Sequence, residues 1–511
     1  MMKTRILIIY LVSIALFTSC KKDLGNYDYT ASEVITISGI KTNYPVIQSV
    51  DKLNIIPEVS SNIEGADFEY VYFTYDLNKG GQDADTVLKN SKDLIDYVVG
   101  IESGRYALVF RARNKKTNVS GYFHSVLDVS TRFNDGWYVL KSEGNKSDMD
   151  YFNQAGEKIE DVVLSVNGRQ LDGDVAHRIG VNDNYADPNK FLPNYNIFEK
   201  TRVLIPVTNK DAKAIKLSTG KILNDFPEMF LDKPVAPYSP SMYVANNLGQ
   251  WILNNGKASF IYSYSSLLSK FGPELAMTNE FKDYRLSKYV VSNGVYDPIG
   301  FDELTSSFVA MSTSQTFFIP VGDQSGTEIS AKNNNMKLVF AGAKALYDDF
   351  FYAVMQDKTS AQLKYIANVT GVSGKSFKIA LDKLATNDPA FSAELFTLNH
   401  SLLKVMYFVS NNKVYARSVA GIPGRNTDLQ ISLPQGETAT FIKHIKYSNQ
   451  FDYLIVGTTI GGNYKVYLYP LNNLGEFSGQ TPAKVFSGKG KAGDISFVFP
   501  SISQTTFPLT Y

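Results

Sequence analysis

The sequence has very little of the residue types that build catalytic and metal centres. Cysteine occurs once, as Cys20, and histidine four times, as His124, His177, His400 and His444. One cysteine excludes an intramolecular disulfide and a cysteine-based zinc site, and the histidines do not stand at a zinc-binding spacing. The nucleophile elbow GxSxG and the phosphate loop GxxxxGK[ST] are absent too. The sequence therefore predicts no metal, no cofactor and no enzyme.

Charge of one sign is not in excess either, because 51 Lys and Arg residues stand against 50 Asp and Glu residues. A nucleic-acid-binding surface needs clustered basic residues that neutralise phosphates. The balance therefore predicts no nucleic-acid partner. There is also no basic amphipathic stretch of the kind that binds a membrane surface, so membrane association is expected to depend on an attached lipid.

Long apolar runs are missing as well, and the main one covers residues 6–17. A bilayer-spanning helix needs about 20 apolar residues, so this run is too short. It follows Lys3 and Arg5 and leads through two small residues to Cys20, a layout typical of a secretory signal. We therefore expect residues 1–19 to be removed as a lipoprotein signal peptide and Cys20 to carry fatty acyl groups such as palmitate. Phe17 stands where a lipobox prefers Leu, which leaves an ordinary signal peptide with a chance cysteine as the alternative.

Aromatic and turn-forming residues, by contrast, are abundant, with 32 Tyr, 32 Phe and 36 Gly. Tyr and Phe favour pleated, half-buried strands, which predicts an all-β fold. Residues 20–40 resemble a lipidated tether leading into a strand at 34–37. Residues 41–130 have the length and strand spacing of one β-sandwich, without the Cys–Trp–Cys pattern of antibody domains. Its main strands are predicted at 52–56, 68–75, 104–112 and 121–129.

Residues 131–511 follow a different pattern, in which two strands are joined by a tight polar turn. Asn and Gly in these turns accept the positive φ that hairpins require. The hairpins recur roughly every 45–60 residues, which is typical of a β-propeller with about seven blades. Two or three stacked sandwiches are the alternative, and short helices are expected at 265–271 and 343–351. The hairpins are predicted at 137–152, 242–253, 404–417 and 453–469.

Two short stretches carry a family resemblance. The stretch Cys-Lys-Lys-Asp-Leu-Gly-Asn-Tyr-Asp-Tyr begins at Cys20, and Asn-Asp-Gly-Trp-Tyr-Val-Leu ends at Leu140. With the sandwich between them, the chain resembles the PKD-like family of Bacteroidetes lipoproteins, which carry a PKD/Ig-like module before a long β-rich region. The Lys-Lys-Asp after Cys20 also resembles the signal that sends such lipoproteins to the cell surface. The motifs lie within the first 140 residues and transfer no binding residues.

The resemblance implies a location and a set of partners. Such proteins are typically encoded beside SusC/SusD-type uptake systems, so the implied place is the outer membrane, lipid-anchored and facing outward. The implied partners are a SusC/SusD-type transporter and a glycan or peptide nutrient. The predicted function is therefore a non-enzymatic binding or accessory component of nutrient uptake. A hydrolase with its site in the propeller channel and a purely structural transporter subunit remain alternatives.

Candidate ligand-binding residues are aromatic. Trp251, Tyr243 and Tyr262 fall on one predicted blade, where flat rings could stack on sugar rings. Burial between blades is the favoured interpretation for these rings, because a propeller needs bulky side chains there, and the preference is strongest for Trp137 in its apolar strand. The segment 182–189 is rich in Asp and Asn, which are calcium ligands, but it lacks the EF-hand pattern and is expected to be a solvated loop.

Overall fold

The computed structural model describes residues 32–498 except for short gaps at 49–50, 78–85, 132, 134, 247, 263–266, 278–282, 293–295, 313–314, 345–347, 401–402, 420–426 and 448–449. Cys20 and the predicted signal peptide lie outside the described residues. The chain divides into two compact units, residues 1–129 and 130–511. Among the described residues, no helix has the length and apolarity that crossing a membrane requires.

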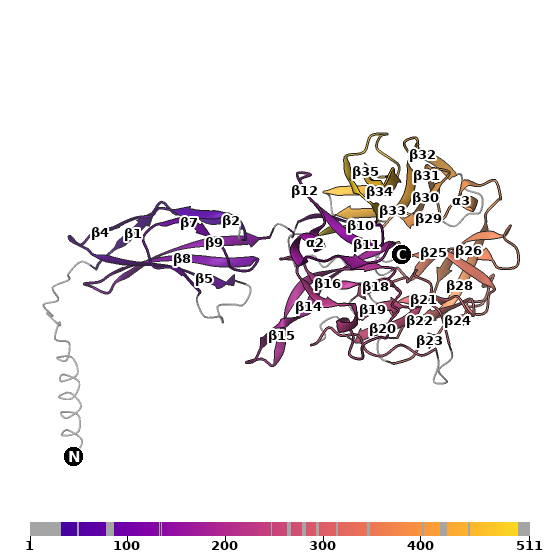
Figure 1. The fold of residues 1–511 in the computed structure, drawn as a ribbon, viewed down its shortest axis with the longest axis horizontal. Coiled ribbons are helices and arrows are strands. Elements are labelled where there is room, and N and C mark those ends of the chain that lie inside the picture. Colours follow the sequence, from indigo (N-terminus) through magenta and orange to yellow (C-terminus); the bar gives the residue numbers. More distant parts are fainter. Residues whose placement is uncertain are drawn as a thin grey trace, which may run out of the picture. The chain divides into compact units, whose positions relative to one another are not determined.

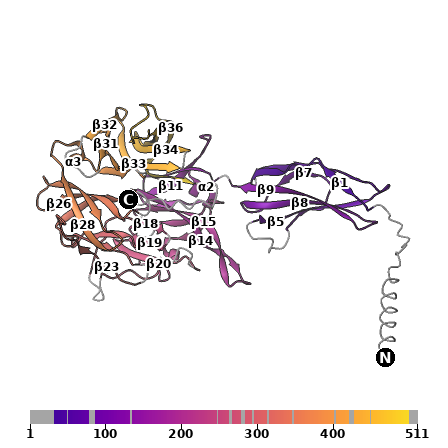
Figure 2. The same cartoon turned by 180° about the vertical axis from the view of Figure 1, so that it is seen from behind.

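The first unit is the predicted sandwich, built from nine strands in the described residues (Figures 1 and 2). Its buried side chains alternate along the strands, and Tyr72, Phe110 and Leu127 lie at its centre. The first described strand covers Ile35–Ser38, which agrees with the strand predicted at 34–37 where the tether ends. The paired strands are β1 (Ile35–Ser38) with β4 (Glu58–Ser61), β3 (Lys52–Ile55) with β7 (Leu94–Val98), and β2 (Asn43–Ile47), β9 (Ser120–Ser130), β8 (Gly104–Asn114), β5 (Phe68–Asp76) and β6 (Thr86–Lys89) in that order.

The second unit is a β-propeller whose seven sheets follow one another in chain order around an axis (Figure 1). This confirms the all-β fold and the predicted number of blades. Blade 1 holds β37 (Lys491–Val498), β10 (Gly136–Glu143), β11 (Lys146–Asn153), β12 (Lys158–Ile159) and β13 (Leu171–Asp172). Blade 2 holds β14 (Ala176–Leu192), β15 (Ile197–Thr208), β16 (Lys213–Lys216) and β17 (Ile222–Asp225). Blade 3 holds β18 (Pro240–Asn246), β19 (Gly249–Asn254) and β20 (Lys257–Tyr262).

The remaining blades complete the ring. Blade 4 holds β21 (Ile299–Asp302), β22 (Ser307–Ala310) and β23 (Ile319–Pro320). Blade 5 holds β25 (Met336–Gly342), β26 (Phe350–Asp357), β27 (Lys364–Thr370), β28 (Ser376–Lys383) and the short β24 (Gly322–Asp323). Blade 6 holds β29 (Leu395–Leu398), β30 (Val405–Ser410), β31 (Lys413–Ser418) and β32 (Thr427–Ser432). Blade 7 holds β33 (Thr438–Tyr447), β34 (Phe451–Ile460), β35 (Asn463–Pro470) and β36 (Lys484–Lys489).

The ring is closed by a strand from the far end of the chain. β37 pairs antiparallel with β10, from Gly136 opposite Val498 to Ser142 opposite Lys491. At Gly493 the register shifts, and a Cβ there would come within 2.1 Å of the carbonyl oxygen of Ala176 on blade 2. The closing strand therefore needs glycine at its closest approach to the neighbouring blade.

Apolar side chains fill the space between neighbouring blades. Each adjacent pair of blades encloses one cluster of buried residues, which gives seven clusters around the ring. Trp137 lies between blades 7 and 1, is 2% exposed, and has its ring centroid 4.8 Å from that of Phe497. The prediction that Trp137 is a core residue is therefore confirmed.

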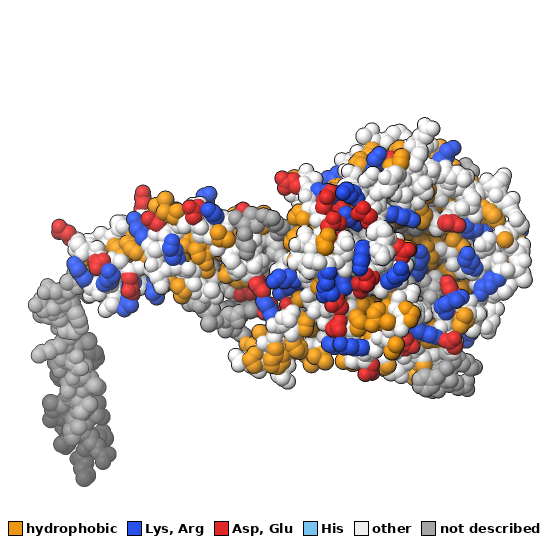
Figure 3. Space-filling model, viewed as in Figure 1, with side chains coloured by type: hydrophobic (Ala, Val, Ile, Leu, Met, Phe, Trp, Pro, Cys, Tyr) orange, Lys and Arg blue, Asp and Glu red, His pale blue; other side chains and the backbone are white. Residues whose placement is uncertain are grey.

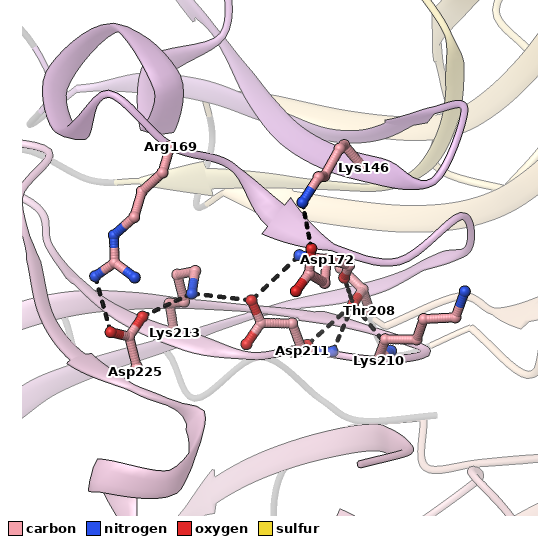
Figure 4. A network of polar contacts seen from close by, with 8 residues as sticks. All are labelled: Lys146, Arg169, Asp172, Thr208, Lys210, Asp211, Lys213 and Asp225. Atoms are coloured by element: carbon pink, nitrogen blue, oxygen red, sulfur yellow. Dashed lines mark hydrogen bonds and ion pairs between the residues drawn. The ribbon is translucent and has the colours of Figure 1, made fainter. Parts of the chain in front are cut away.

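Ion pairs also join the blades. Between blades 7 and 1, the buried Asp150 accepts hydrogen bonds from Lys141 at 2.9 Å and from the hydroxyl of Tyr464 at 2.6 Å. Between blades 1 and 2 a chain of contacts runs near the blade surface (Figure 4). There Arg169 and Lys213 both bind Asp225, at 2.8 and 2.7 Å, and Lys213 also binds Asp211 at 2.9 Å.

Two local predictions are wrong. The described parts of 265–271 and 343–351 are not helical, and Phe350 and Phe351 belong to β26. The helices of the described residues are α2 (Val162–Asn167), α3 (Pro389–Ser392) and the 3₁₀ turn η2 (Phe226–Met229). The four predicted hairpins are confirmed as β10–β11, β18–β19, β30–β31 and β34–β35.

Candidate functional site

A cavity of about 240 Å³ lies at the axis of the propeller. Its lining comes from residues near the start of β14, β18, β29, β33 and β37, which are the innermost strands of their sheets. Blade 4 contributes Lys288 and Tyr289. Because these inner strands all start near this cavity, side chains from blades far apart in the sequence meet there.

The charged lining of this axial cavity is mostly basic. It contains Arg178, Lys288, Lys443 and Lys491 against the carboxylates of Asp174 and Asp494. On the face of the second unit seen in Figure 3, charged side chains of both signs are intermixed. The lining of the axial cavity, with four cations against two carboxylates, therefore carries a local excess of positive charge.

Asp494 neutralises one of the cations and ties three blades together. It accepts hydrogen bonds from Lys443 Nζ at 2.8 Å and from the backbone N–H of Ile179 at 2.8 Å. Lys443 also donates to the carbonyl of Ile495 at 2.9 Å. Burial lowers the pKa of Lys443, and the Asp494 carboxylate opposes that shift. This pair fixes strands of blades 1, 2 and 7 and is a structural element of the cavity wall.

Lys288 lies in a different environment. Its segment forms the irregular inner edge of blade 4, where the backbone N–H of Ser287 donates to the carbonyl of Phe301 at 2.9 Å and Val291 exchanges two backbone hydrogen bonds with Ile299. The Lys288 side chain is solvent-accessible. Partial desolvation by the surrounding protein nevertheless lowers the pKa of its ammonium. Its ammonium makes no salt bridge or hydrogen bond to any residue that the structure describes, and it lies 5.3 Å from the centroid of the Tyr289 ring.

His177 is the one histidine in the axial cavity. Burial, assisted by the positive charge of Lys288, lowers the pKa of His177 to about 4. The imidazole is therefore neutral near pH 7 and can donate or accept a hydrogen bond without adding charge.

A second hollow of about 570 Å³ adjoins the first and shares Ser241, Lys288 and Tyr289 with it. Its charged lining adds Arg285, Lys337, Glu303 and Glu394. Arg285 binds Glu303 at 3.1 Å. Lys288 therefore stands at the junction of two hollows that together receive residues from all seven blades.

The other histidines do not line either hollow. His400 and His444 are stacked edge to face with centroids 5.6 Å apart, and His444 Nε2 lies 2.7 Å from Asp452. Because His444 Nδ1 accepts the backbone N–H of His400 at 2.8 Å, Nε2 must carry the proton that binds Asp452. This buried pair braces blades 6 and 7. His124 is exposed on β9 of the first unit.

The predicted aromatic platform is not formed by the two rings that can be placed. Trp251 and Tyr243 are each 1% exposed and lie in the clusters on either side of blade 3. The Tyr243 hydroxyl receives a hydrogen bond from Asn182 at 3.1 Å and donates to Gln250 at 3.1 Å. Tyr262 ends β20, and its side chain lies outside the described part of the chain. Trp251 and Tyr243 are therefore core residues, as the favoured interpretation held, and not ligand-binding residues.

The segment 182–189 is not a solvated loop but an irregular part of β14, with register shifts on both sides of Tyr185. Asp183 binds Arg202 at 2.8 Å and Asp187 binds Lys216 at 3.0 Å. Its carboxylates are thus already neutralised. Across the described residues, no group of three or more His, Cys, Asp or Glu side chains could hold a metal ion.

Comparison with known proteins gives one family match. Residues 20–174 match the PKD-like family. The matched segment contains the sandwich of the first unit and extends over β10 to β13 of the first blade. No curated protein matches the chain.

Several solved structures show distant likeness. A quinonprotein alcohol dehydrogenase-like protein from Bacteroides thetaiotaomicron is 14% identical over 90% of this chain and 97% of its own, with a TM-score of 0.37. Dihydro-heme d1 dehydrogenase NirN is 8% identical over 72% of this chain and 76% of its own, with a TM-score of 0.40. PorZ, a surface component of the type-IX secretion system of Porphyromonas gingivalis, is 8% identical over 77% and 53%, with a TM-score of 0.32. Likenesses this distant carry no inference about activity.

Proposed function

We propose that this chain is a lipid-anchored protein of the outer-membrane surface that captures a nutrient without chemically changing it. The observation that carries the proposal is the pair of joined hollows at the propeller axis. Hollows with a few convergent polar groups are the usual place for ligand binding, and loops held by a rigid scaffold commonly supply the contacts. The capture would make the chain an accessory component of a SusC/SusD-type uptake system for a glycan or peptide.

The arrangement of charge favours binding over catalysis. Acid–base catalysis needs a titrating group positioned near a reacting atom, with a pKa close to the working pH. The His177 pKa of about 4 makes that ring a poor proton donor at neutral pH, and Asp494 already holds Lys443 and Ile179. These groups are suited to orienting a bound molecule.

The proposed lipid anchor is supported by Cys20 and by the family resemblance of the residues that follow it. Replacing Cys20 by Ser should abolish palmitate incorporation and move the protein from the membrane fraction to the soluble fraction of the cell. The wild-type chain, labelled and fractionated in parallel, is the control. Equal membrane association of the two chains would contradict the lipid anchor.

The capture function is tested with the full-length protein purified in detergent. Calorimetric titration with a panel of neutral glycans, acidic glycans and peptides should give saturable binding to at least one class, with no change in that ligand afterwards. Turnover of any panel member would favour the hydrolase alternative. Co-purification with the transporter but no binding to the panel would favour a structural subunit.

A further inference from the structure

Two lysines of the axial cavity have opposite surroundings. Lys443 is buried and its ammonium is compensated by Asp494 at 2.8 Å. Lys288 has no counter-ion among the described residues, although nearby protein atoms partly remove its water and lower its pKa. Because no described carboxylate pairs with Lys288, its ammonium can donate charge-assisted hydrogen bonds to a bound anion.

Three of the four carboxylates that line the two hollows are paired with other cations. The pairs are Arg285 with Glu303 at 3.1 Å, Lys443 with Asp494 at 2.8 Å and Lys210 with Asp174 at 3.5 Å. Three lysines of the two hollows, Lys288, Lys337 and Lys491, make no salt bridge to a described residue, and Glu394 is the carboxylate left to face them. The joined hollows therefore have a positive potential that attracts anions.

The uncharged part of the wall suits a sugar ring. Tyr289 is half-buried, lines both hollows, and has its ring centroid 5.3 Å from the Lys288 ammonium. The hydroxyl of Ser241 and the neutral imidazole of His177 offer hydrogen bonds to ligand hydroxyls. Aromatic carbon next to polar hydrogen-bonding groups matches the alternating apolar and hydroxyl-bearing faces of a sugar.

We infer that the joined hollows bind an acidic sugar, with Lys288 holding its carboxylate or sulfate group. The inference rests on the proposed capture function and adds the chemical class of the ligand. Binding is non-covalent, and the ligand oxyanion accepts hydrogen bonds from the Lys288 ammonium. The oxyanion thus serves as the counter-ion of Lys288, as the Asp494 carboxylate does for Lys443. Charge-assisted bonds of this kind are shorter and stronger than neutral ones.

The test compares trigalacturonate with the neutral galactotriose and with sodium sulfate, by calorimetry on the full-length protein at low salt. We expect trigalacturonate to bind at least about tenfold more tightly than galactotriose, since a hydrogen bond to a charged group contributes roughly a factor of ten or more. Lys288→Gln should remove that preference. Lys413→Gln, which changes an exposed lysine of β31 away from both hollows, should leave it unchanged.

The possible results distinguish failure of the acidic-sugar inference from failure of the proposed capture function. Equal binding of both trisaccharides, unaffected by Lys288→Gln, would overturn the acidic ligand class and leave capture standing. Sulfate binding as tightly as trigalacturonate, and lost in Lys288→Gln, would overturn the sugar assignment. Absence of binding to every member of the wider panel would overturn capture itself. An unchanged melting temperature of Lys288→Gln verifies that the variant is folded, because Lys288 has no salt bridge to lose among the described residues.

Discussion

The two units of the chain place their charged side chains differently. In the described part of the first unit the buried polar residues are Thr74, Asn114 and Ser125, and no Lys, Arg, Asp or Glu is buried. The second unit buries many charged side chains, such as Asp150 and Lys443, and uses them to join neighbouring blades.

Sheet packing explains this difference. A sandwich leaves one face of each sheet in water, so alternate residues of every strand can carry charge at no desolvation cost. In a propeller both faces of each sheet are covered by neighbouring blades, and the inner strands converge at the axis. Polar residues at those positions must find partners or face open space. Both lysines line the axial cavity, but Lys443 is paired with Asp494 and Lys288 has no carboxylate partner among the described residues.

The largest loss of stability is expected from the apolar cluster between blades 7 and 1, where the ring closes. Trp137→Ala should lower the free energy of unfolding of the propeller by about 4 kcal/mol, since it empties the space between blades 7 and 1. Chemical denaturation followed by circular dichroism should show an early propeller transition and an unchanged sandwich transition. A matched Phe110→Ala change in the first unit should do the reverse. If each variant destabilised both units equally, the units would not fold as separate entities.

A somewhat smaller effect is expected from the buried ion pair at the axis. Lys443→Met should lower the free energy of unfolding by about 3 kcal/mol, because it leaves the Asp494 carboxylate buried without its cation. Lys288→Met, at the lysine without such a pair, should change stability by no more than about 0.5 kcal/mol. The two denaturation curves are the measurement, and the double variant Lys443→Met with Asp494→Asn should recover part of the loss. Equal losses of unfolding free energy in Lys443→Met and Lys288→Met would contradict the proposed difference between a paired and an unpaired lysine.

A pH effect of about 2 kcal/mol is expected from Asp148, which caps α2 by accepting the N–H groups of Val163 at 2.8 Å and Leu164 at 3.0 Å. Burial raises the pKa of Asp148 from 3.8 to about 6. Between these pH values the unfolded chain releases a proton that the folded chain keeps. The free energy of unfolding should therefore fall as pH rises from 4 to 6 and then level off.

Denaturation of wild type and Asp148→Asn across this pH range provides the measurement. The variant is expected to be less stable, because an amide replaces one carboxylate acceptor, but the pH-dependent part of its stability should be reduced. Identical pH slopes would show that Asp148 does not titrate in this range.

The smallest effect is expected from a surface pair of the first unit. Lys115 binds Asp67 at 3.1 Å with both side chains about half exposed. Lys115→Met should change the free energy of unfolding by less than about 0.5 kcal/mol, because water and salt screen such pairs. A loss of stability comparable to that of Lys443→Met would contradict the distinction between the exposed ion pairs of the first unit and the buried ion pairs of the second.

Local patterns in the sequence predicted the repeating units well, as the hairpin β10–β11 illustrates. Its apolar strands and its Gly144–Asn145 turn are short-range features, and eight residue pairs align as expected. The long hairpin β14–β15 was missed because Asp and Asn in 182–189 suggested a loop. In the structure, pairing with β15 and the cations Arg202 and Lys216 stabilises those residues in a strand. Tertiary partners override local propensity there.

The candidate site was harder to foresee. Trp251 and Tyr243 were chosen for their side-chain chemistry, but their strands carry them into the spaces between blades. Lys288 has no motif around it and lies in an irregular segment, so nothing in the sequence marked it. Its place in the site depends on neighbours more than 100 residues away, such as His177, whose pKa is lowered by burial and by the positive charge of Lys288.

What the sequence by itself determined is the set of short-range choices: apolar alternation that makes strands, Asn and Gly that make turns, and an amino-terminal pattern that predicts export and lipidation of Cys20. These depend on residues close together in the chain. Closure of the ring by β37, the charge at its axis and the hollow beside Lys288 depend on segments far apart in the chain, and Asp494 and Ile179 are separated by 315 positions. Only the tertiary structure decides which of these residues meet, because each contact is made through the packing of whole blades.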